Sequence, residues 1–270
     1  MRDTLSPLII TSMNERLYNE YGHRFFDTFD RRYELIVYHE DYSDSANNKP
    51  PYIPSWAGAI HTPTNQPEAY RWIDRHSNDP VTSYRHDAVR FAHKVFAMWH
   101  GVINYSGWRT AYDGIIWMDA DVVFKQMPDP KTLIEYCKHP NKHIALYDRP
   151  EHPETGFIWF DMHHKEINRW NSTYYHMGTH FVNVLRDYYL QDRIYQLKEQ
   201  HDAYVIGHIL RTEFKGKWQS LSTVERAPER HPQAVSGSAK WWDICRAPAN
   251  RKSTRLNSSH EWISRMPSSA

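Results

Sequence analysis

Two aspartates, Asp119 and Asp121, directly follow an apolar run at residues 114–118. A spacing of two residues puts both side chains on the same side of an extended chain. Carboxylates that converge in this way repel each other unless a cation lies between them. Because Mg²⁺ and Mn²⁺ prefer oxygen ligands, we predict that Asp119 and Asp121 bind one of these ions, which could neutralise a diphosphate leaving group. The motif is short, and a strand-end turn with solvated carboxylates is the alternative.

The first forty residues must position this motif. The apolar runs at residues 8–11 and 35–38 are typical of buried strands. Between them Leu17, Tyr21, Phe25 and Phe29 recur at helical spacing. A strand, a helix and a second strand in this order indicate a βαβ unit.

The alternation continues through the middle of the chain. An apolar stripe over residues 88–102 predicts a helix, residues 144–147 and 157–160 predict strands, and residues 179–189 and 202–210 predict helices. No strong periodicity follows residue 215. The fold class predicted is α/β, a Rossmann-like αβα sandwich with a mostly parallel, partly mixed sheet. Asp119 and Asp121 then lie beyond the carboxyl end of a strand, where open α/β sheets bind ligands.

Residues 41–84 differ in character from the rest. Six prolines interrupt them, so we expect no long regular elements there. They also carry Tyr52, Trp56, Tyr70 and Trp72, and a disordered linker is rarely so aromatic. We therefore expect an ordered insertion within a single domain that covers residues 1–250.

With these pieces in order, the chain resembles the GT-A glycosyltransferases, whose DxD motif follows a central strand and holds the metal and diphosphate of a nucleotide sugar. More narrowly, it resembles phage and bacterial glycosyltransferase-like proteins over roughly residues 7–215. The resemblance implies a GT-A-like fold and a metal-dependent transferase of the hexosyltransferase type with a nucleotide-sugar donor. The acceptor is left open among a carbohydrate, a protein and a modified base.

The same resemblance points to further site residues. Arg85, Asp87 and Lys94 would contact the nucleotide or its phosphates, although Asp87 and Lys94 fall opposite the apolar stripe and a solvated helix face is the alternative. Glu154, which precedes a strand, would border the donor sugar or the acceptor, and an ordinary turn at Gly156 is its alternative.

Asp202 is a carboxylate at the start of the apolar face of a predicted helix. It shares a helix face with Val205, Ile206 and Ile209. A carboxylate buried without a partner costs several kcal/mol, so Asp202 should have a partner or a task. It either reaches the donor sugar or acts as the base on the acceptor hydroxyl; an N-cap of the helix is the alternative.

The chain also departs from the family pattern. A third metal ligand is not evident. Gly237, Lys240 and Trp241 resemble part of a late H-x-x-G-x-x-K-P-W pattern, but His231 is at the wrong distance and the proline is absent. His176 and His180 could bind a metal at i, i+4 spacing, but no third ligand is spaced to complete that site.

Two other functions stay open at this point. A haloacid-dehalogenase-like phosphatase would use Asp119 as nucleophile and Asp121 as acid, but that motif normally follows the first strand of its domain. A non-catalytic carbohydrate-binding module would use the Trp- and Tyr-rich insertion.

Composition narrows the class of protein. The chain has 270 residues, a formal net charge of +1 and 40% hydrophobic residues, so it can form a folded core and carries no strong nucleic-acid signal. No run approaches the ~20 apolar residues of a membrane span, and the first residues do not resemble a signal peptide. Two cysteines suit a reducing compartment. We expect a cytoplasmic protein.

Residues 251–270, RKSTRLNSSHEWISRMPSSA, resemble the translation of a common short-read sequencing adapter. The resemblance implies a non-native tail, a metagenomic or similar short-read source, and a natural chain that continues differently beyond residue 250. Without the tail, 29 basic residues face 31 acidic ones and the formal charge becomes −2.

Deletion of residues 251–270 should leave the melting temperature within about one degree of the full chain, because an adapter-derived tail was never selected to pack. A thermal melt of the two chains checks this. A drop of several degrees would mean that the tail is a native element.

Overall fold

The computed structural model describes residues 6–40, 49–106, 112–124, 127–162, 165–167 and 174–221. A seven-stranded sheet runs through these residues in the order β3-β2-β1-β4-β6-β5-β9. Its strands are β1 (Ser6–Met13), β2 (Glu34–His39), β3 (Gly58–His61), β4 (Tyr112–Met118), β5 (Ile144–Tyr147), β6 (Glu154–Asp161) and β9 (Trp218–Ser220). A separate antiparallel pair joins β7 (Lys165–Ile167) to β8 (Tyr174–His176).

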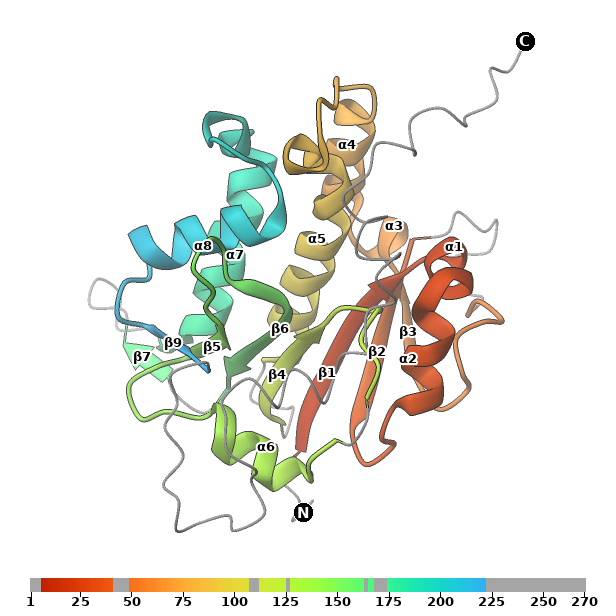
Figure 1. The fold of residues 1–270 in the computed structure, drawn as a ribbon, viewed down its shortest axis with the longest axis vertical. Helices are drawn as coiled ribbons and strands as arrows, with labels where there is room; N and C mark the ends of the chain where they lie inside the picture. Colours follow the sequence, from red (N-terminus) through yellow and green to blue (C-terminus); the bar gives the residue numbers. More distant parts are fainter. Residues whose placement is uncertain are drawn as a thin grey trace.

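Helices flank the sheet (Figure 1). The longer ones are α4 (Pro67–His76), α5 (Ala88–Tyr105), α6 (Pro130–Cys137), α7 (Met177–Leu190) and α8 (Asp202–Thr212). The shorter ones are α1 (Glu15–Leu17), the π-helix η1 (Tyr18–Gly22), α2 (His23–Thr28), α3 (Thr62–Asn65), and the 3₁₀ turns η2 (Tyr84–His86) and η3 (Arg193–Gln196). The predicted helix over residues 17–29 is therefore present, but a π-helical turn interrupts it.

The sheet changes direction at its centre. β3, β2, β1 and β4 run parallel to one another. β6 runs antiparallel to both β4 and β5, and β9 runs parallel to β5. The predicted α/β sandwich with a mostly parallel, partly mixed sheet is confirmed.

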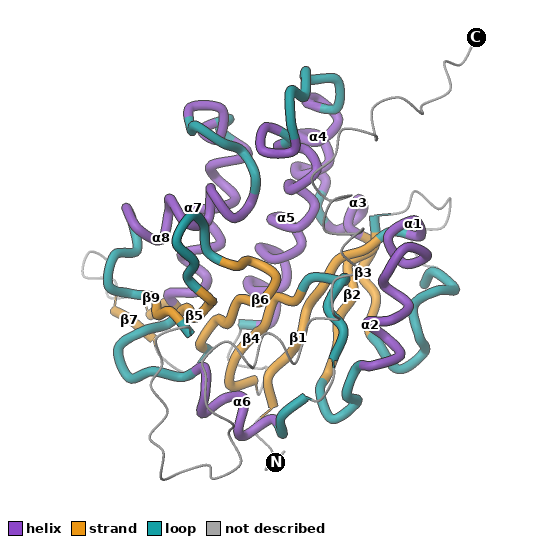
Figure 2. The backbone as a smooth tube through the Cα atoms, in the orientation of Figure 1, coloured by secondary structure: helices purple, strands orange, loops and turns teal. Residues whose placement is uncertain are grey.

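Two apolar cores lie on the two faces of the sheet, because alternate residues of each strand point to opposite sides. On β1, Leu8 and Ile10 join the core formed with α4, α5, α7 and α8. Ile9 and Met13 join the core formed with α2 and α6. The same division is visible in Figures 1 and 2, where the strands form a layer between two groups of helices.

The proline-rich segment is more regular than its sequence indicates. Its described part, residues 49–84, supplies the edge strand β3 and the ten-residue helix α4. Pro67 is at the first position of α4, where a missing N–H costs nothing. Trp72 on that helix is 2% exposed. The expectation of no long regular element is therefore wrong for residues 67–76; residues 41–48 lie outside the described ranges.

Within the described ranges, no helix combines the length and the apolar character that a membrane crossing requires.

Gly114 marks the tightest contact between β4 and β6. A Cβ added there would lie 2.2 Å from Cη2 of Trp159, and Trp159 is 1% exposed, so its ring cannot swing into solvent. We expect Gly114→Ala to lower the free energy of unfolding by about 2 kcal/mol, as overpacking does.

Chemical denaturation measures this effect, and a double-mutant cycle with Trp159→Leu isolates it. In the Trp159→Leu background the same glycine substitution should cost less than about 0.5 kcal/mol, because the obstructing ring is gone. An equal cost in both backgrounds would contradict the proposed clash.

Candidate functional site

Asp119 is held at the carboxyl end of β4, where β6 begins and the N-terminal parts of α5 and α8 approach. Its backbone N–H donates to the carbonyl of Gly156 on β6 at 3.0 Å. The indole N–H of Trp117 donates to Asp119 Oδ1 at 2.7 Å. The end of the strand and a buried ring therefore fix the direction of this carboxylate.

Lys94 joins Asp119 to Asp202. Its Nζ lies 2.8 Å from Asp119 Oδ1 and 2.6 Å from Asp202 Oδ2, and it donates to the Thr155 carbonyl at 2.9 Å. The Thr155 hydroxyl donates to Asp202 Oδ2 at 2.6 Å. We call Lys94, Asp119, Thr155 and Asp202 the Lys94 cluster.

Three of the four members of this cluster are buried. Lys94 is 9% exposed, Thr155 5% and Asp202 6%. The alternative interpretation of Lys94 as part of a solvated helix face is therefore wrong. Its three ammonium hydrogens already have partners in the cluster, so Lys94 orients the two carboxylates.

The charges of the cluster shift the pKa values of its members. Burial raises the pKa of Asp119 to about 6, although Lys94 acts in the opposite sense, and the charges of Asp121 and Asp202 raise it further. For Asp202, burial is outweighed by the ion pair with Lys94 and the hydrogen bond from Thr155, so its pKa falls below the ordinary value. Burial would lower the pKa of Lys94, but the two aspartates raise it.

Asp121 is exposed, two residues beyond Asp119. Burial raises the pKa of Tyr21 on η1, and the charge of Asp121 is the next cause. Asp121 is therefore close enough to Tyr21, in the helix that follows β1, for its charge to act on that side chain. Asp121 thus adds a third carboxylate to those of Asp119 and Asp202. Carboxylate oxygens are the ligands that a divalent Mn²⁺ or Mg²⁺ ion prefers.

Arg85 and Asp87 are engaged with other groups. Asp87 caps α5 and accepts the backbone N–H of Arg90 at 3.1 Å. Arg85 pairs with Glu199 Oε1 and with Glu151 Oε1, each at 3.1 Å. Their predicted contacts with a nucleotide stay predictions.

Glu154 lies at the start of β6, next to Thr155 of the cluster. Its Oε1 accepts the Gly156 N–H at 3.1 Å, and its Oε2 lies 2.5 Å from an Arg149 guanidinium nitrogen. Glu154 is thus near the site, and its predicted catalytic role stays a prediction.

The N-cap of α8 is His201, whose Nδ1 accepts the N–H of Tyr204 at 3.4 Å. The alternative interpretation of Asp202 as the N-cap is therefore wrong. The expectation that Asp202 has a partner is met by Lys94 and Thr155. Thr155 escaped the sequence analysis because a threonine at a strand start carries no chemical signal of its own. The late residues Gly237, Lys240, Trp241 and His231 lie outside the described ranges.

The comparisons with known proteins give distant structural likenesses. No family model matches this chain, and no curated protein matches it. Among solved structures it is similar to mouse xyloside xylosyltransferase 1 in its apo form, at 10% identity and a TM-score of 0.46, over 80% of this chain and 85% of that one.

Two further solved structures are similar to this chain. The apo bifunctional glycosyltransferase WbbM matches at 11% identity and a TM-score of 0.41, over 82% of this chain and 39% of that one. A glycosyltransferase involved in glycosylation of the major capsid of PBCV-1 matches at 8% identity and a TM-score of 0.40, over 88% and 98%. The chemistry of the site rests on its own residues.

Replacement of Lys94 by methionine should lower the free energy of unfolding by about 3 kcal/mol, because it leaves Asp202 buried without its ion pair. Chemical denaturation measures the loss. The double variant Lys94→Met/Asp202→Asn should recover part of the loss, since a neutral amide costs less to bury than a carboxylate. Wild-type stability of Lys94→Met would contradict the arrangement of the cluster.

Proposed function

We propose that this chain is a glycosyltransferase that moves a sugar from a nucleotide-diphosphate donor to an acceptor, with Mn²⁺ or Mg²⁺ at Asp119 and Asp121. The observation that carries the proposal is the gathering of carboxylates at the carboxyl end of β4, where Asp119 and Asp202 share the Lys94 ammonium group and Asp121 follows two residues later. A divalent ion held there would neutralise the charge that develops on the diphosphate as it leaves.

Asp202 suits the donor sugar better than it suits proton transfer. Its pKa is lowered, chiefly because Lys94 and Thr155 offset the effect of burial, so it stays ionised and is a weak base. An ionised carboxylate accepts hydrogen bonds from sugar hydroxyls. Lys94 and Thr155 fix its orientation before the donor arrives.

The transfer itself requires three events. The acceptor hydroxyl attacks the anomeric carbon of the donor sugar, the bond from that carbon to the diphosphate oxygen breaks, and the acceptor proton leaves to a base. We assign Glu154, the carboxylate next to the cluster, to the acceptor side, and a guanidinium nitrogen of Arg149 lies 2.5 Å from its Oε2.

The two other functions have less support. A haloacid-dehalogenase-like phosphatase carries its aspartate after the first strand of the domain, whereas Asp119 follows the fourth strand along this chain and β6, the strand next to it, runs antiparallel. A carbohydrate-binding module needs aromatic rings that face solvent. Here Trp72 and Tyr70 are buried, Tyr52 stacks on Tyr18, and Trp56 stacks on Phe29.

A thermal-shift screen of nucleotide sugars with Mn²⁺ tests the proposed function, followed by an assay for release of the nucleoside diphosphate. Stabilisation by one donor class and slow donor hydrolysis support it. Binding without turnover supports the binding module, and hydrolysis of p-nitrophenyl phosphate supports the phosphatase.

Asp121→Asn should weaken Mn²⁺-dependent binding of a nucleoside diphosphate by tenfold or more, a change of about 1.4 kcal/mol, because the second carboxylate ligand is lost. Asp121 is exposed, so the melting temperature should not change. Isothermal titration calorimetry measures the affinity, and Asp74→Asn on the exposed face of α4 is the matched control. Equal affinities for wild type and Asp121→Asn would remove the metal assignment.

A further inference from the structure

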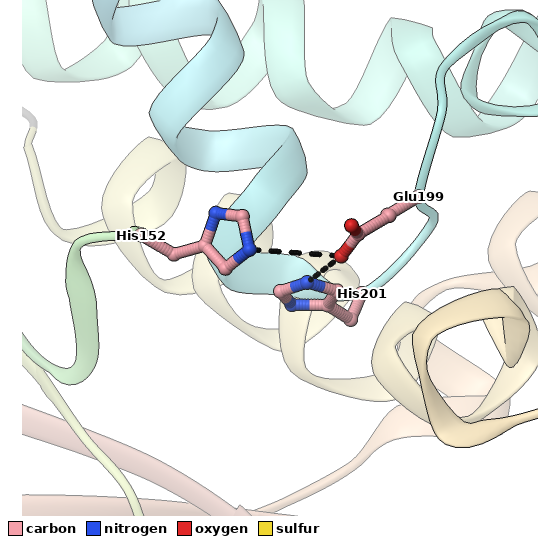
Figure 3. A group of neighbouring side chains, drawn as sticks. All are labelled: His152, Glu199 and His201. Atoms are coloured by element: carbon pink, nitrogen blue, oxygen red, sulfur yellow. Dashed lines mark hydrogen bonds and ion pairs between the residues drawn. The ribbon is translucent and has the colours of Figure 1, made fainter. Parts of the chain in front are cut away.

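Three side chains of the kinds that bind metals, His152, Glu199 and His201, lie close together, as Figure 3 shows. His152 comes from the loop between β5 and β6, and Glu199 and His201 come from the segment that leads into α8. One ligand atom from each residue lies within 4.8 Å of the other two. His201 Nε2 is 2.8 Å from Glu199 Oε2, and His152 Nε2 is 3.6 Å from the same oxygen.

One nitrogen of this group makes no hydrogen bond. His152 Nε2 is buried, and it points at the Glu199 carboxylate from 3.6 Å, which is beyond hydrogen-bond distance (Figure 3). Glu199 and His201 are also buried, at 6% and 5% exposure. A buried ring nitrogen without a hydrogen bond is costly unless something else occupies the site.

We propose that His152, Glu199 and His201 form a Zn²⁺ site. Zn²⁺ binds imidazole nitrogen and carboxylate oxygen at about 2.0–2.2 Å, which places neighbouring ligand atoms about 3.4 Å apart in a tetrahedron. The two separations from Glu199 Oε2, 2.8 and 3.6 Å, bracket that value. The two histidine nitrogens lie within 4.8 Å of each other, so the rings must move together slightly to bind one ion. Water completes the fourth position. Two imidazoles favour Zn²⁺ over Mg²⁺, which requires oxygen ligands.

Neighbouring residues hold Glu199 in an orientation that suits a zinc ligand. Arg85 holds Oε1 at 3.1 Å, so Oε2 is left to face the two histidines. Carboxylates that bind metal ions are usually held in place by hydrogen bonds of this kind. Although burial raises the pKa of Glu199, its hydrogen bond with His201 and the charge of Arg85 bring it below the ordinary value. Burial, the largest effect, lowers the pKa of His201, which favours the neutral imidazole that binds metals.

Zinc binding requires one rearrangement. His201 Nδ1 now accepts the Tyr204 N–H at a long 3.4 Å, and His201 Nε2–H donates to Glu199. The cation takes the place of that Nε2 proton, and the ring proton moves to Nδ1. Zinc binding would therefore replace the long hydrogen bond from the Tyr204 N–H, which caps α8, with a bond between His201 and the metal. Glu151, near both His152 and Arg85, adds negative charge that favours the cation.

The consequence is a cross-link between two loops that border the Lys94 cluster. His152 is two residues before Glu154, and His201 directly precedes Asp202. Zinc would fix the β5–β6 loop against the start of α8. The proposal does not depend on the proposed transferase activity, because it rests only on these three side chains.

Zinc alone is the probe. Competition with a chromophoric chelator should give one Zn²⁺ per full chain, and His152→Ala and Glu199→Gln should each weaken its binding by tenfold or more. Zinc at a hundredfold excess over its dissociation constant should raise the melting temperature by roughly 5–10 °C. Cobalt substitution should give the visible absorption of a four-coordinate ion in wild type but not in His152→Ala.

Two controls locate the site. His180→Ala removes an exposed histidine on α7 and should keep the wild-type zinc affinity. Asp119→Asn/Asp121→Asn should also keep it, so a failure of the Mn²⁺ or Mg²⁺ assignment leaves this test unaffected. The proposal is overturned if wild type binds no zinc at micromolar concentration, if His152→Ala keeps the wild-type affinity, or if His180→Ala loses affinity equally.

Discussion

The buried ammonium of Lys94 is the interaction on which the arrangement of the site depends. It lies within 2.8 Å of one oxygen from Asp119, which directly follows β4, and one from Asp202, which begins α8. Asp202 is buried, and leaving its carboxylate without this ion pair would cost several kcal/mol, whereas Asp119 is partly exposed. α5, β4 and α8 are therefore held together by charge as well as by the apolar core that they share.

The reversal of strand direction next to β4 makes this arrangement possible. Because β6 runs antiparallel to β4, its first residues lie beside the last residues of β4. Thr155 can therefore contact both Lys94 and Asp202, and Gly156 accepts the Asp119 N–H. A parallel neighbour would place its own amino end at the opposite edge of the sheet, and the Lys94 cluster would lose its fourth member.

The sequence predicts several elements and residues of this site, but not that these residues contact one another in the folded chain. An apolar run that ends in Asp119 and Asp121 is visible without a structure, and so is the helical stripe over residues 88–102. The burial of Lys94 is not, because α4 and α7 pack on α5 as well as the sheet, and Asp202, its partner, follows 108 residues later. β9 has three residues, too few for a periodic signal. α4 does carry a helical stripe, Ala69, Tyr70, Trp72 and Ile73, but the prolines around it favour an irregular segment.

The segment from Glu199 to Asp202 contributes side chains to two neighbouring groups of charged residues. Glu199 and His201 face His152, whereas Asp202 faces Lys94. The backbone N–H groups of Gln200 and His201 donate to the carbonyl of Arg85, which ties the same segment to the start of α5. Because adjacent residues serve the two groups, a cation bound by His152, Glu199 and His201 would restrict the backbone that carries Asp202. The orientation of the carboxylate assigned to the donor sugar and the occupancy of the zinc site are then physically linked, through one peptide bond.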